Sequence, residues 1–534
     1  MKRFVYLYGL CVLLIVSLFG CQMPMGMHET ASDARHRPGA PMVASEGQVP
    51  EIPVDNTGDT FEDVGTNPFV LVDGDPLSTF AADVDTASYD IFRRDINNGL
   101  LPVPTSVRLE EYVNYFDYDY PVPIPDLDGP FTLTLDSAPN PFTEGTDLIS
   151  IGIRGREMAA EKKPTNLVFL VDTSGSMSST LKIGLVKLVL KETLEVLYDT
   201  DTISIVTYAG NTSVALEATP VSDKAAILQA IDDLGAHGST AGAAGLTLAY
   251  EQAETAFIED GMNHILLCTD GDFNVGPSSD DALVDLIEEK RKTGITFTVL
   301  GFGTGNLNDS MMEKISNAGN GVYGVISDAD QATNYVYTRM LSTMLFIAQD
   351  MKIQVEFNPE QVLAYRLLGY ENRAIKDEEF RDDKVDAGEV GAGHTVTALY
   401  EIVRTGGLVP VPEGAPELVD NPPFDGETQV EADELCRVKI RYKEVGATEE
   451  DPAFEVWKSI STVSDDLSDA SADMQWAASV AAISEVLKGS PYASMEKLEL
   501  AVSLIHANIG NDPLRVEFAA LLDQAMLLLT ENPN

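Results

Sequence analysis

A short apolar segment that ends abruptly in a polar turn constrains the fold of this chain more than any other feature. Residues 167–171 are all apolar, and Asp172, Ser174 and Ser176 follow at alternate positions, with Gly175 between the serines. Such a run, bounded by a turn, is typical of a buried parallel strand. Ligands of open α/β sheets bind at the carboxyl ends of these strands. One carboxylate and two hydroxyls at that edge would suit a hard cation such as Mg²⁺, Mn²⁺ or Ca²⁺.

Two later segments complete this pattern. Thr240 follows a Gly-Ser pair and precedes a predicted helix, so it offers a third hydroxyl. A second apolar strand, residues 264–269, is followed by Asp270 and a glycine. We therefore predict that a second carboxylate lies at the same edge of the sheet.

The order Asp-x-Ser-x-Ser, Thr and Thr-Asp-Gly closely resembles the metal-ion-dependent adhesion site of the von Willebrand factor type A domain. The resemblance implies that Ser174, Ser176 and Thr240 are hydroxyl ligands of a divalent cation, with Mg²⁺ first and Mn²⁺ or Ca²⁺ as alternatives. It implies that Asp172 and Asp270 do not contact the cation directly but hold these hydroxyls, or waters bound to the cation. It also implies a protein ligand that offers a carboxylate to the metal.

Three enzyme and metal-binding signatures fit these residues less well. The aspartic-protease signature Asp-Thr-Gly would need its glycine one residue earlier than Gly175, and no second copy follows. A serine nucleophile would need a Gly-x-Ser-x-Gly turn, which neither serine has. The segment after Asp270 departs from the EF-hand pattern at Val275 and Asp281. A Ser/Asp turn without a metal stays open as the alternative.

The N-terminus is predicted to be a targeting segment. An apolar run over residues 4–19 follows two basic residues, and Cys21 comes directly after it. The run is short for a membrane span and has the charged start of a signal peptide. Residues 1–21 resemble a bacterial lipoprotein signal peptide, which implies a lipid on Cys21. Because Gln22 follows, the resemblance implies an outer-membrane location in the cell envelope. An uncleaved membrane anchor is the alternative.

The charge and the cysteine content limit the classes of partner. A formal net charge of −50 would repel nucleic acid and anionic lipid. Between Glu444 and Asp473, nine acidic residues accompany one lysine, and we predict a solvated loop there. Beyond Cys21 and the discarded leader, only Cys268 and Cys436 remain. They do not form a disulfide framework, although one bridge between them stays open.

Periodicity predicts the following organisation. After the signal peptide at 1–21, the Pro- and Gly-containing segment 22–66 is predicted to be a flexible tether. An N-terminal β-rich domain spans 67–160. A doubly wound α/β domain with a mostly parallel sheet spans 164–347. A β-rich part at 351–445 and a helical segment at 468–530 make up the C-terminal domain.

The whole layout resembles a family of bacterial envelope lipoproteins in which a type A domain lies between a short N-terminal domain and a C-terminal domain of unknown function. The Asp-Val-Asp-Thr-Ala-Ser-Tyr motif at 83–89 carries part of this resemblance. We predict a turn and an N-cap role for its aspartates. Neither β-rich flank has many strands, and a lone hairpin is marginally stable. We therefore expect 131–153 to pair with 352–442 in one β-sandwich, into which the type A domain is inserted.

Two functions follow from these features. The first is a membrane-tethered binding module, not an enzyme, which captures an acidic group of a partner through a divalent cation. The second is a metal-assisted hydrolase, in which the cation activates water. A hydrolase would need a general base or acid near the metal, and His237 is the one histidine close to the motif in sequence. We expect the binding module.

Overall fold

The computed structural model describes residues 58–82, 85–124, 129–157, 163–236, 242–271, 280–385, 387–448 and 451–531. All of them belong to one compact unit, Ile52–Asn534. None of the helices in this described part of the chain has the length and apolar character needed to cross a membrane.

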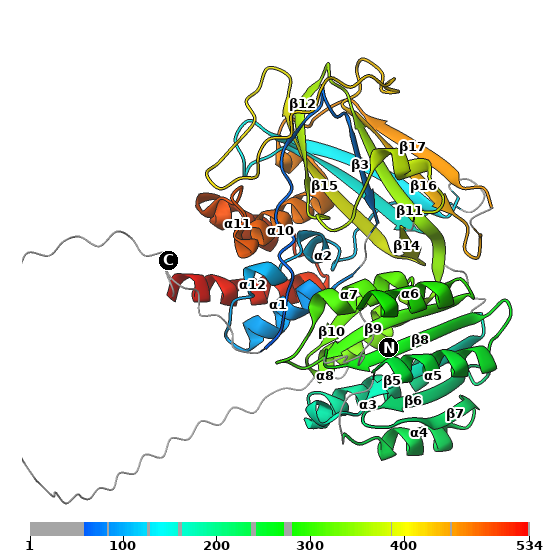
Figure 1. Cartoon of the computed structure of the whole chain (residues 1–534). Coiled ribbons are helices and arrows are strands. Elements are labelled where there is room, and N and C mark those ends of the chain that lie inside the picture. The colour runs from blue at the N-terminus through cyan, green and yellow to red at the C-terminus, as the bar shows by residue number, and fades with distance from the viewer. Residues whose placement is uncertain are drawn as a thin grey trace, which may run out of the picture. The chain divides into compact units, whose positions relative to one another are not determined.

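The central domain is the predicted doubly wound α/β fold, with the strand order β10-β9-β8-β5-β6-β7 (Figure 1). Neighbouring strands are parallel except β6 and β7, which are antiparallel, so the expected edge hairpin is present. The strands are β5 (Thr165–Asp172), β6 (Thr202–Tyr208), β7 (Thr212–Pro220), β8 (Met262–Thr269), β9 (Ile295–Phe302) and β10 (Tyr323–Ile326).

Helices cover both faces of this sheet, which explains why residues 167–171 of β5 are all apolar. Leu167 and Phe169 pack into one hydrophobic cluster, together with residues of α3 and α8. Val168 and Leu170 point the other way, into a cluster with α5, α6 and α7. The helices are α3 (Ile183–Val196), α4 (Lys224–Asp233), α5 (Gly242–Thr255), α6 (Asp280–Arg291), α7 (Asp309–Ala318) and α8 (Ala329–Tyr335).

The end of this domain differs from the predicted single helix over 329–347. After α8 comes a π-helical turn, Val336–Met340, and then α9, Leu341–Met344. Strand β11 (Phe346–Phe357) begins only two residues later. Its first residues pair with β14 (Gly388–Gly391), a partner that sequence periodicity did not reveal. This pairing explains why the strand begins before the predicted Lys352.

The expected β-sandwich is confirmed, because the two flanks of the central domain share both of its sheets. In one sheet β4 pairs with β15, with Ile151 opposite Ala398. In the other, β2 pairs with β11, with Phe80 opposite Ile353. The sheet orders are β1-β12-β15-β4-β3 and β13-β2-β11-β16-β17, with β14 beside β11. The remaining bounds are β1 (Val70–Leu71), β2 (Leu77–Ala81), β3 (Phe131–Pro139), β4 (Asp147–Gly155), β12 (Val362–Leu368), β13 (Ala374–Ile375), β15 (Thr395–Arg404), β16 (Cys436–Lys443) and β17 (Phe454–Ile460).

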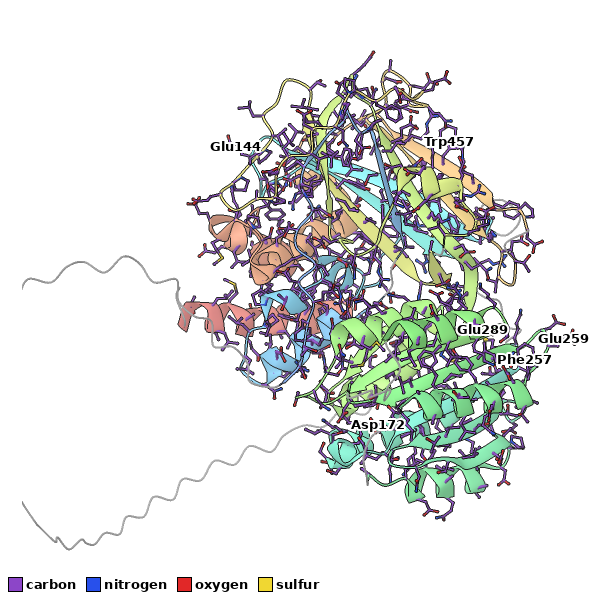
Figure 2. The ribbon with its side chains drawn as sticks, viewed as in Figure 1. Glu144, Asp172, Phe257, Glu259, Glu289 and Trp457 are labelled. Atoms are coloured by element: carbon purple, nitrogen blue, oxygen red, sulfur yellow. The ribbon has the colours of Figure 1, made fainter. Side chains whose placement is uncertain are left out.

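Part of the predicted acidic loop is a strand. β17 pairs with β16 at the edge of the second sheet. Its side chains are mostly exposed, including Phe454 and Trp457, the second of which is labelled in Figure 2. The prediction of a loop at 444–473 was therefore wrong for these seven residues. An edge strand with most of its side chains exposed lacks the clear alternating pattern on which strand prediction depends.

Five helices from both ends of the folded unit share one further core. They are α1 (Ala87–Asn97), α2 (Leu109–Val113), α10 (Ala472–Lys488), α11 (Leu498–Ala507) and α12 (Pro513–Glu531). The rings of Phe116, Trp476 and Phe518 contact one another in this core. Gly489 ends α10 in a left-handed conformation, with φ +70°.

The segment 58–66, at the end of the predicted tether, is docked on the α/β domain. Backbone hydrogen bonds join Thr60 to Leu307 and Asp309, at 2.8 and 3.2 Å. The buried carboxylate of Asp59 forms an ion pair with Arg94 at 2.8 Å. The prediction of a flexible tether was therefore wrong for these residues, because backbone hydrogen bonds and a buried acidic side chain fix a segment of otherwise loop-like composition.

Asp85 also has a role other than the predicted helix cap. Its carboxylate accepts a 2.7 Å hydrogen bond from the backbone N–H of Tyr323, at the start of β10. It also pairs with Arg373 of the sandwich at 2.9 Å. Asp85 therefore joins the flank to the edge of the α/β sheet. Asp83, the other aspartate of the motif, lies outside the described residues.

Candidate metal centre

The candidate centre begins with Asp172, the last residue of β5, at the carboxyl edge of the sheet. Figure 2 shows Asp172 at one edge, with Phe257 and Glu259 at the opposite edge. Asp172 is buried, and its Oδ1 accepts a 2.7 Å hydrogen bond from the backbone N–H of Ser174. The hydroxyl of Thr269 donates to its Oδ2 at 3.3 Å. These two donors fix the carboxylate beneath the serine turn.

The two serine hydroxyls converge as predicted. The Oγ atoms of Ser174 and Ser176 lie 2.9 Å apart. Ser174 is 2% exposed, whereas Ser176 lies in the exposed 3₁₀ turn Gly175–Ser178. One hydroxyl is therefore built into the domain, and the other faces solvent.

Asp270 is the second carboxylate at this edge, immediately after β8, which runs parallel to β5. It is buried, and its Oδ2 accepts a 2.8 Å hydrogen bond from Lys182 Nζ. Its Oδ1 is also buried and has no hydrogen-bond partner among the described residues. Gly271 has φ +99°, and a Cβ atom there would lie 2.5 Å from Leu307 Cα. Only glycine lets the turn after Asp270 approach the neighbouring loop so closely.

Two ionised carboxylates without a bound cation are electrostatically unfavourable at this centre. Burial raises the pKa of Asp172 to about 6, while the N–H and hydroxyl of Ser174 lower it. The negative charge of Asp270 also contributes to the raised pKa of Asp172. A cation at this edge would stabilise both charged carboxylates.

The donor set fits a hard divalent cation. Two hydroxyls 2.9 Å apart and a buried carboxylate oxygen without a partner are oxygen ligands of the kind that Mg²⁺ prefers. No group of three or more His, Cys, Asp or Glu side chains that could hold a metal occurs in the part of the chain that the structure describes. Such a centre would therefore depend on hydroxyls. Thr240, the third predicted hydroxyl, and His237 lie outside the described residues, as does Cys21.

Lys182 and Asn306 are part of this centre and were missed from the sequence. Lys182 Nζ donates to Asn306 Oδ1 at 2.9 Å as well as to Asp270. A lone lysine before a helix carries no pattern that distinguishes it from a surface lysine. Asn306 lies in a loop that only the folded sheet brings close to Asp270.

The two remaining cysteines are free and buried, so no bridge joins them. Burial raises the pKa of the Cys268 thiol, which lies within β8, well above its usual value. Burial also raises the pKa of Cys436, to about 12. A thiol that stays protonated is a poor nucleophile and a poor metal ligand.

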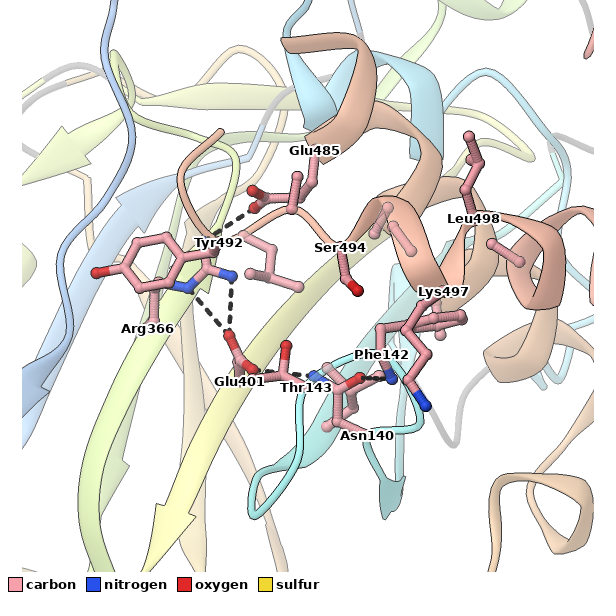
Figure 3. Close-up of a pocket in the computed structure, with 17 residues that line it drawn as sticks. Asn140, Phe142, Thr143, Arg366, Glu401, Glu485, Tyr492, Ser494, Lys497 and Leu498 are labelled. Atoms are coloured by element: carbon pink, nitrogen blue, oxygen red, sulfur yellow. Dashed lines mark hydrogen bonds and ion pairs between the residues drawn. The ribbon is translucent and has the colours of Figure 1, made fainter. Parts of the chain in front are cut away.

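A separate pocket lies where the sandwich meets α10 and α11 (Figure 3). Arg366 lies there between Glu401 and Glu485, at 2.8 and 2.9 Å, and beneath the ring of Tyr492. The cavity measures about 40 Å³, which is room for a few water molecules. Its charged side chains pair with one another, as in a structural ion-pair cluster.

Comparison with known families divides the chain into three parts. Residues 166–338 match the von Willebrand factor type A domain, residues 55–150 match a von Willebrand factor region, and residues 342–528 match the C-terminal region of the uncharacterized protein YfbK.

The chain is similar over most of its length to the uncharacterized protein YfbK of Escherichia coli K12. They are 38% identical over 496 residues, which cover 91% of this chain and 84% of the relative. The uncharacterized protein sll0103 of Synechocystis is 30% identical over 169 residues, which cover 32% of this chain and 39% of the relative. Inter-alpha-trypsin inhibitor heavy chain H3 of Homo sapiens is 24% identical over 300 residues, which cover 52% of this chain and 33% of the relative.

Solved structures with a related fold include a von Willebrand factor type A protein from Catenulispora acidiphila. It is 17% identical, with a TM-score of 0.41, over 78% of this chain and 91% of that one. The ArnB paralog VWA2 from Sulfolobus acidocaldarius is 14% identical, with a TM-score of 0.35, over 75% and 98% of the two chains.

Proposed function

This chain belongs to the family of the Escherichia coli protein YfbK, with a type A domain between an N-terminal von Willebrand factor region and a YfbK-type C-terminal domain, and on this premise we propose that it is a metal-dependent protein-binding module tethered in the bacterial envelope. The type A matches favour an interaction module rather than an enzyme. The finer proposal is that a divalent cation joins the chain to a carboxylate of a partner protein.

The observation that carries this proposal is the arrangement around Asp270. Its unpartnered Oδ1 and the hydroxyl pair of Ser174 and Ser176 lie at the carboxyl edge of neighbouring strands. A cation bound there directly by neutral hydroxyls would still attract an acidic ligand of a partner. Ser176, on the exposed turn, places the site where a partner can reach it.

Hydrolysis is the weaker alternative, because it needs a free proton acceptor near the metal, and the two carboxylates of the centre already accept hydrogen bonds from Ser174 and Lys182. Among the described residues, His264 lies on a strand of this sheet, but it is buried. Burial lowers its pKa to about 3, and its Nδ1 lies 2.6 Å from Thr296 Oγ1. Capture of a carboxylate needs no base.

The location is proposed from the sequence. Cys21 follows a segment that resembles a lipoprotein signal peptide, which supports a lipid anchor in the outer membrane. The net charge of −50 favours protein partners over nucleic acid or anionic lipid surfaces.

A pull-down from envelope extract tests this function. The mature chain should capture its partner in Mg²⁺ and release it in chelator. Ser176→Ala should lose the same partner in Mg²⁺, because it removes a ligand of the cation. Ser178→Ala, which removes another exposed hydroxyl of the same turn, should retain it. Capture that survives both chelator and Ser176→Ala would contradict the proposal.

A further inference from the structure

Lys182 is the one lysine seen to contact the candidate metal centre within the described part of the chain. It precedes α3, and its side chain is 11% exposed. Its Nζ reaches Asp270 Oδ2 at 2.8 Å and Asn306 Oδ1 at 2.9 Å. A nearly buried ammonium with two fixed acceptors has a defined position, unlike a surface lysine.

The neighbouring loop is shaped to let this side chain pass. Gly303 has φ +81°, and a Cβ atom there would lie 2.8 Å from Lys182 Cγ and 2.9 Å from its Cε. A side chain at position 303 would therefore collide with the lysine stem. The route of Lys182 into the centre depends on this glycine.

The acceptor Asn306 is itself held from the other side. The backbone N–H groups of Gly305 and Leu307 donate to Asp59 Oδ1 at 2.8 and 2.9 Å. Asn306 lies between these two residues, so the buried Asp59 fixes the backbone that carries it. Arg94 pairs with Asp59 at 2.8 Å and balances its charge. The acceptor Asn306 is therefore held by Lys182 on one side and by Asp59 on the other.

We propose that Lys182 is a permanent cation of the metal centre, which lowers the affinity for the divalent ion and reserves the loaded centre for an anionic partner group. This inference rests on the proposed function. Lys182 neutralises Asp270 through Oδ2 and leaves Oδ1 free to face the cation.

The charges at the centre explain both effects. Asp172 and Asp270 contribute two negative charges when ionised, and Lys182 contributes one positive charge. With a divalent cation the centre would carry one net positive charge, whereas without the lysine it would be neutral. The residual charge would attract a carboxylate, and the same charge would repel the metal. The residual charge therefore favours an anionic partner group, such as the proposed carboxylate, over a neutral hydroxyl or amide.

The test compares wild type with Lys182→Met, which keeps the length of the side chain and removes its charge. Mn²⁺ affinity is measured by calorimetry on the full mature chain. We expect Lys182→Met to bind Mn²⁺ at least about tenfold more tightly, because a neighbouring unit charge is removed. The control is Lys187→Met on α3, whose lysine donates to Asp232 O instead and should leave the affinity unchanged.

The melting temperature gives a second readout, which does not rely on a measured metal affinity. In chelator, Lys182→Met should melt below wild type, since Asp270 loses its cation. Added Mg²⁺ should raise the melting temperature of the variant more than that of wild type. A lysine that served packing alone would lower the melting temperature without changing the Mn²⁺ affinity.

The outcomes separate this inference from the proposed function. Equal or weaker Mn²⁺ binding by Lys182→Met than by wild type would overturn the role of Lys182 and leave the metal site standing. An absence of Mn²⁺ binding by both proteins would overturn the two proposals together. Binding by the variant that exceeds wild type at least tenfold supports both.

Discussion

His264 and Asp172 lie in neighbouring strands of one sheet, and burial changes their proton affinities in opposite directions. The pKa of His264 falls to about 3, whereas that of Asp172 rises to about 6. In both cases burial disfavours the charged form. The two residues also differ in position. Asp172 lies at the carboxyl edge of the sheet, whereas His264 lies within the sheet, between β5 and β9.

His264 makes a testable contribution to the pH dependence of stability. Its folded pKa is below its unfolded value of 6.5, so the unfolded chain binds the extra proton as the pH falls. Stability should therefore fall between pH 6.5 and about 3. Between pH 7 and 5, wild type should lose about 2 kcal/mol more unfolding free energy than His264→Gln. Urea unfolding at the two pH values measures this, and equal losses would contradict it.

Single residues of the candidate centre were predictable only where a motif recorded them. Asp172, Ser174, Ser176 and Asp270 follow strands in a recognisable order, and the structure places them at one edge. Lys182 belongs to no such pattern, since its role comes from a contact across the fold.

At the scale of elements, prediction succeeded where strands are buried on both faces. β5 and β8 are such strands, because the apolar segments at 167–171 and 264–269 mark them in the sequence. β2, β12 and β17 were missed. β2 and β17 carry partly exposed or mixed residues, and β2 also depends on pairing with β11, which lies far along the chain. β12 is largely buried, but Arg366 interrupts its apolar pattern.

The docked segment 58–66 is the element whose role is most easily tested. Asp59→Ala removes the acceptor of the Gly305 and Leu307 N–H groups and the partner of Arg94. Removing one partner of a buried ion pair typically costs about 3–5 kcal/mol. We expect amide exchange at Gly305 and Leu307 to become at least about tenfold faster.

The control for this experiment is Asp63→Ala, in the same segment. Asp63 accepts one hydrogen bond from the N–H of Gly65 at an exposed position. Its removal should leave exchange in the loop of Gly305 unchanged. Equal exchange in Asp59→Ala and wild type would show that the segment does not hold the loop.

At the scale of the whole molecule, buried arginines join the sandwich and its helices to the inserted domain. Arg108, on the flank, pairs with Asp309 of α7 at 2.6 Å and with Glu313 at 3.4 Å. It also bonds Glu111 of α2. Because Asp309 and Glu313 are far from Arg108 in the sequence, no local pattern predicted these pairs. The insertion of the α/β domain into the β-sandwich was predictable, because neither flank alone has enough strands to form a sandwich.

Arg108→Met tests whether this network stabilises the molecule. Three buried carboxylates would lose a common cation, so the free energy of unfolding should fall by about 3–5 kcal/mol. Arg381→Met, which breaks a pair with Glu455 at a more exposed site, should change it by about 1 kcal/mol or less. Thermal unfolding of both variants measures the difference. Similar melting temperatures for the two variants would contradict a stabilising role.

The central claim is that the carboxyl edge of the α/β sheet binds one divalent cation, and calorimetric titration with Mg²⁺ tests it most directly. We predict saturable binding with one ion per chain in wild type. We predict no binding in Asp172→Ala or Thr240→Ala, with circular dichroism spectra that match wild type. Ser178→Ala should bind as wild type does. Equal Mg²⁺ affinity in wild type and Asp172→Ala would contradict the account.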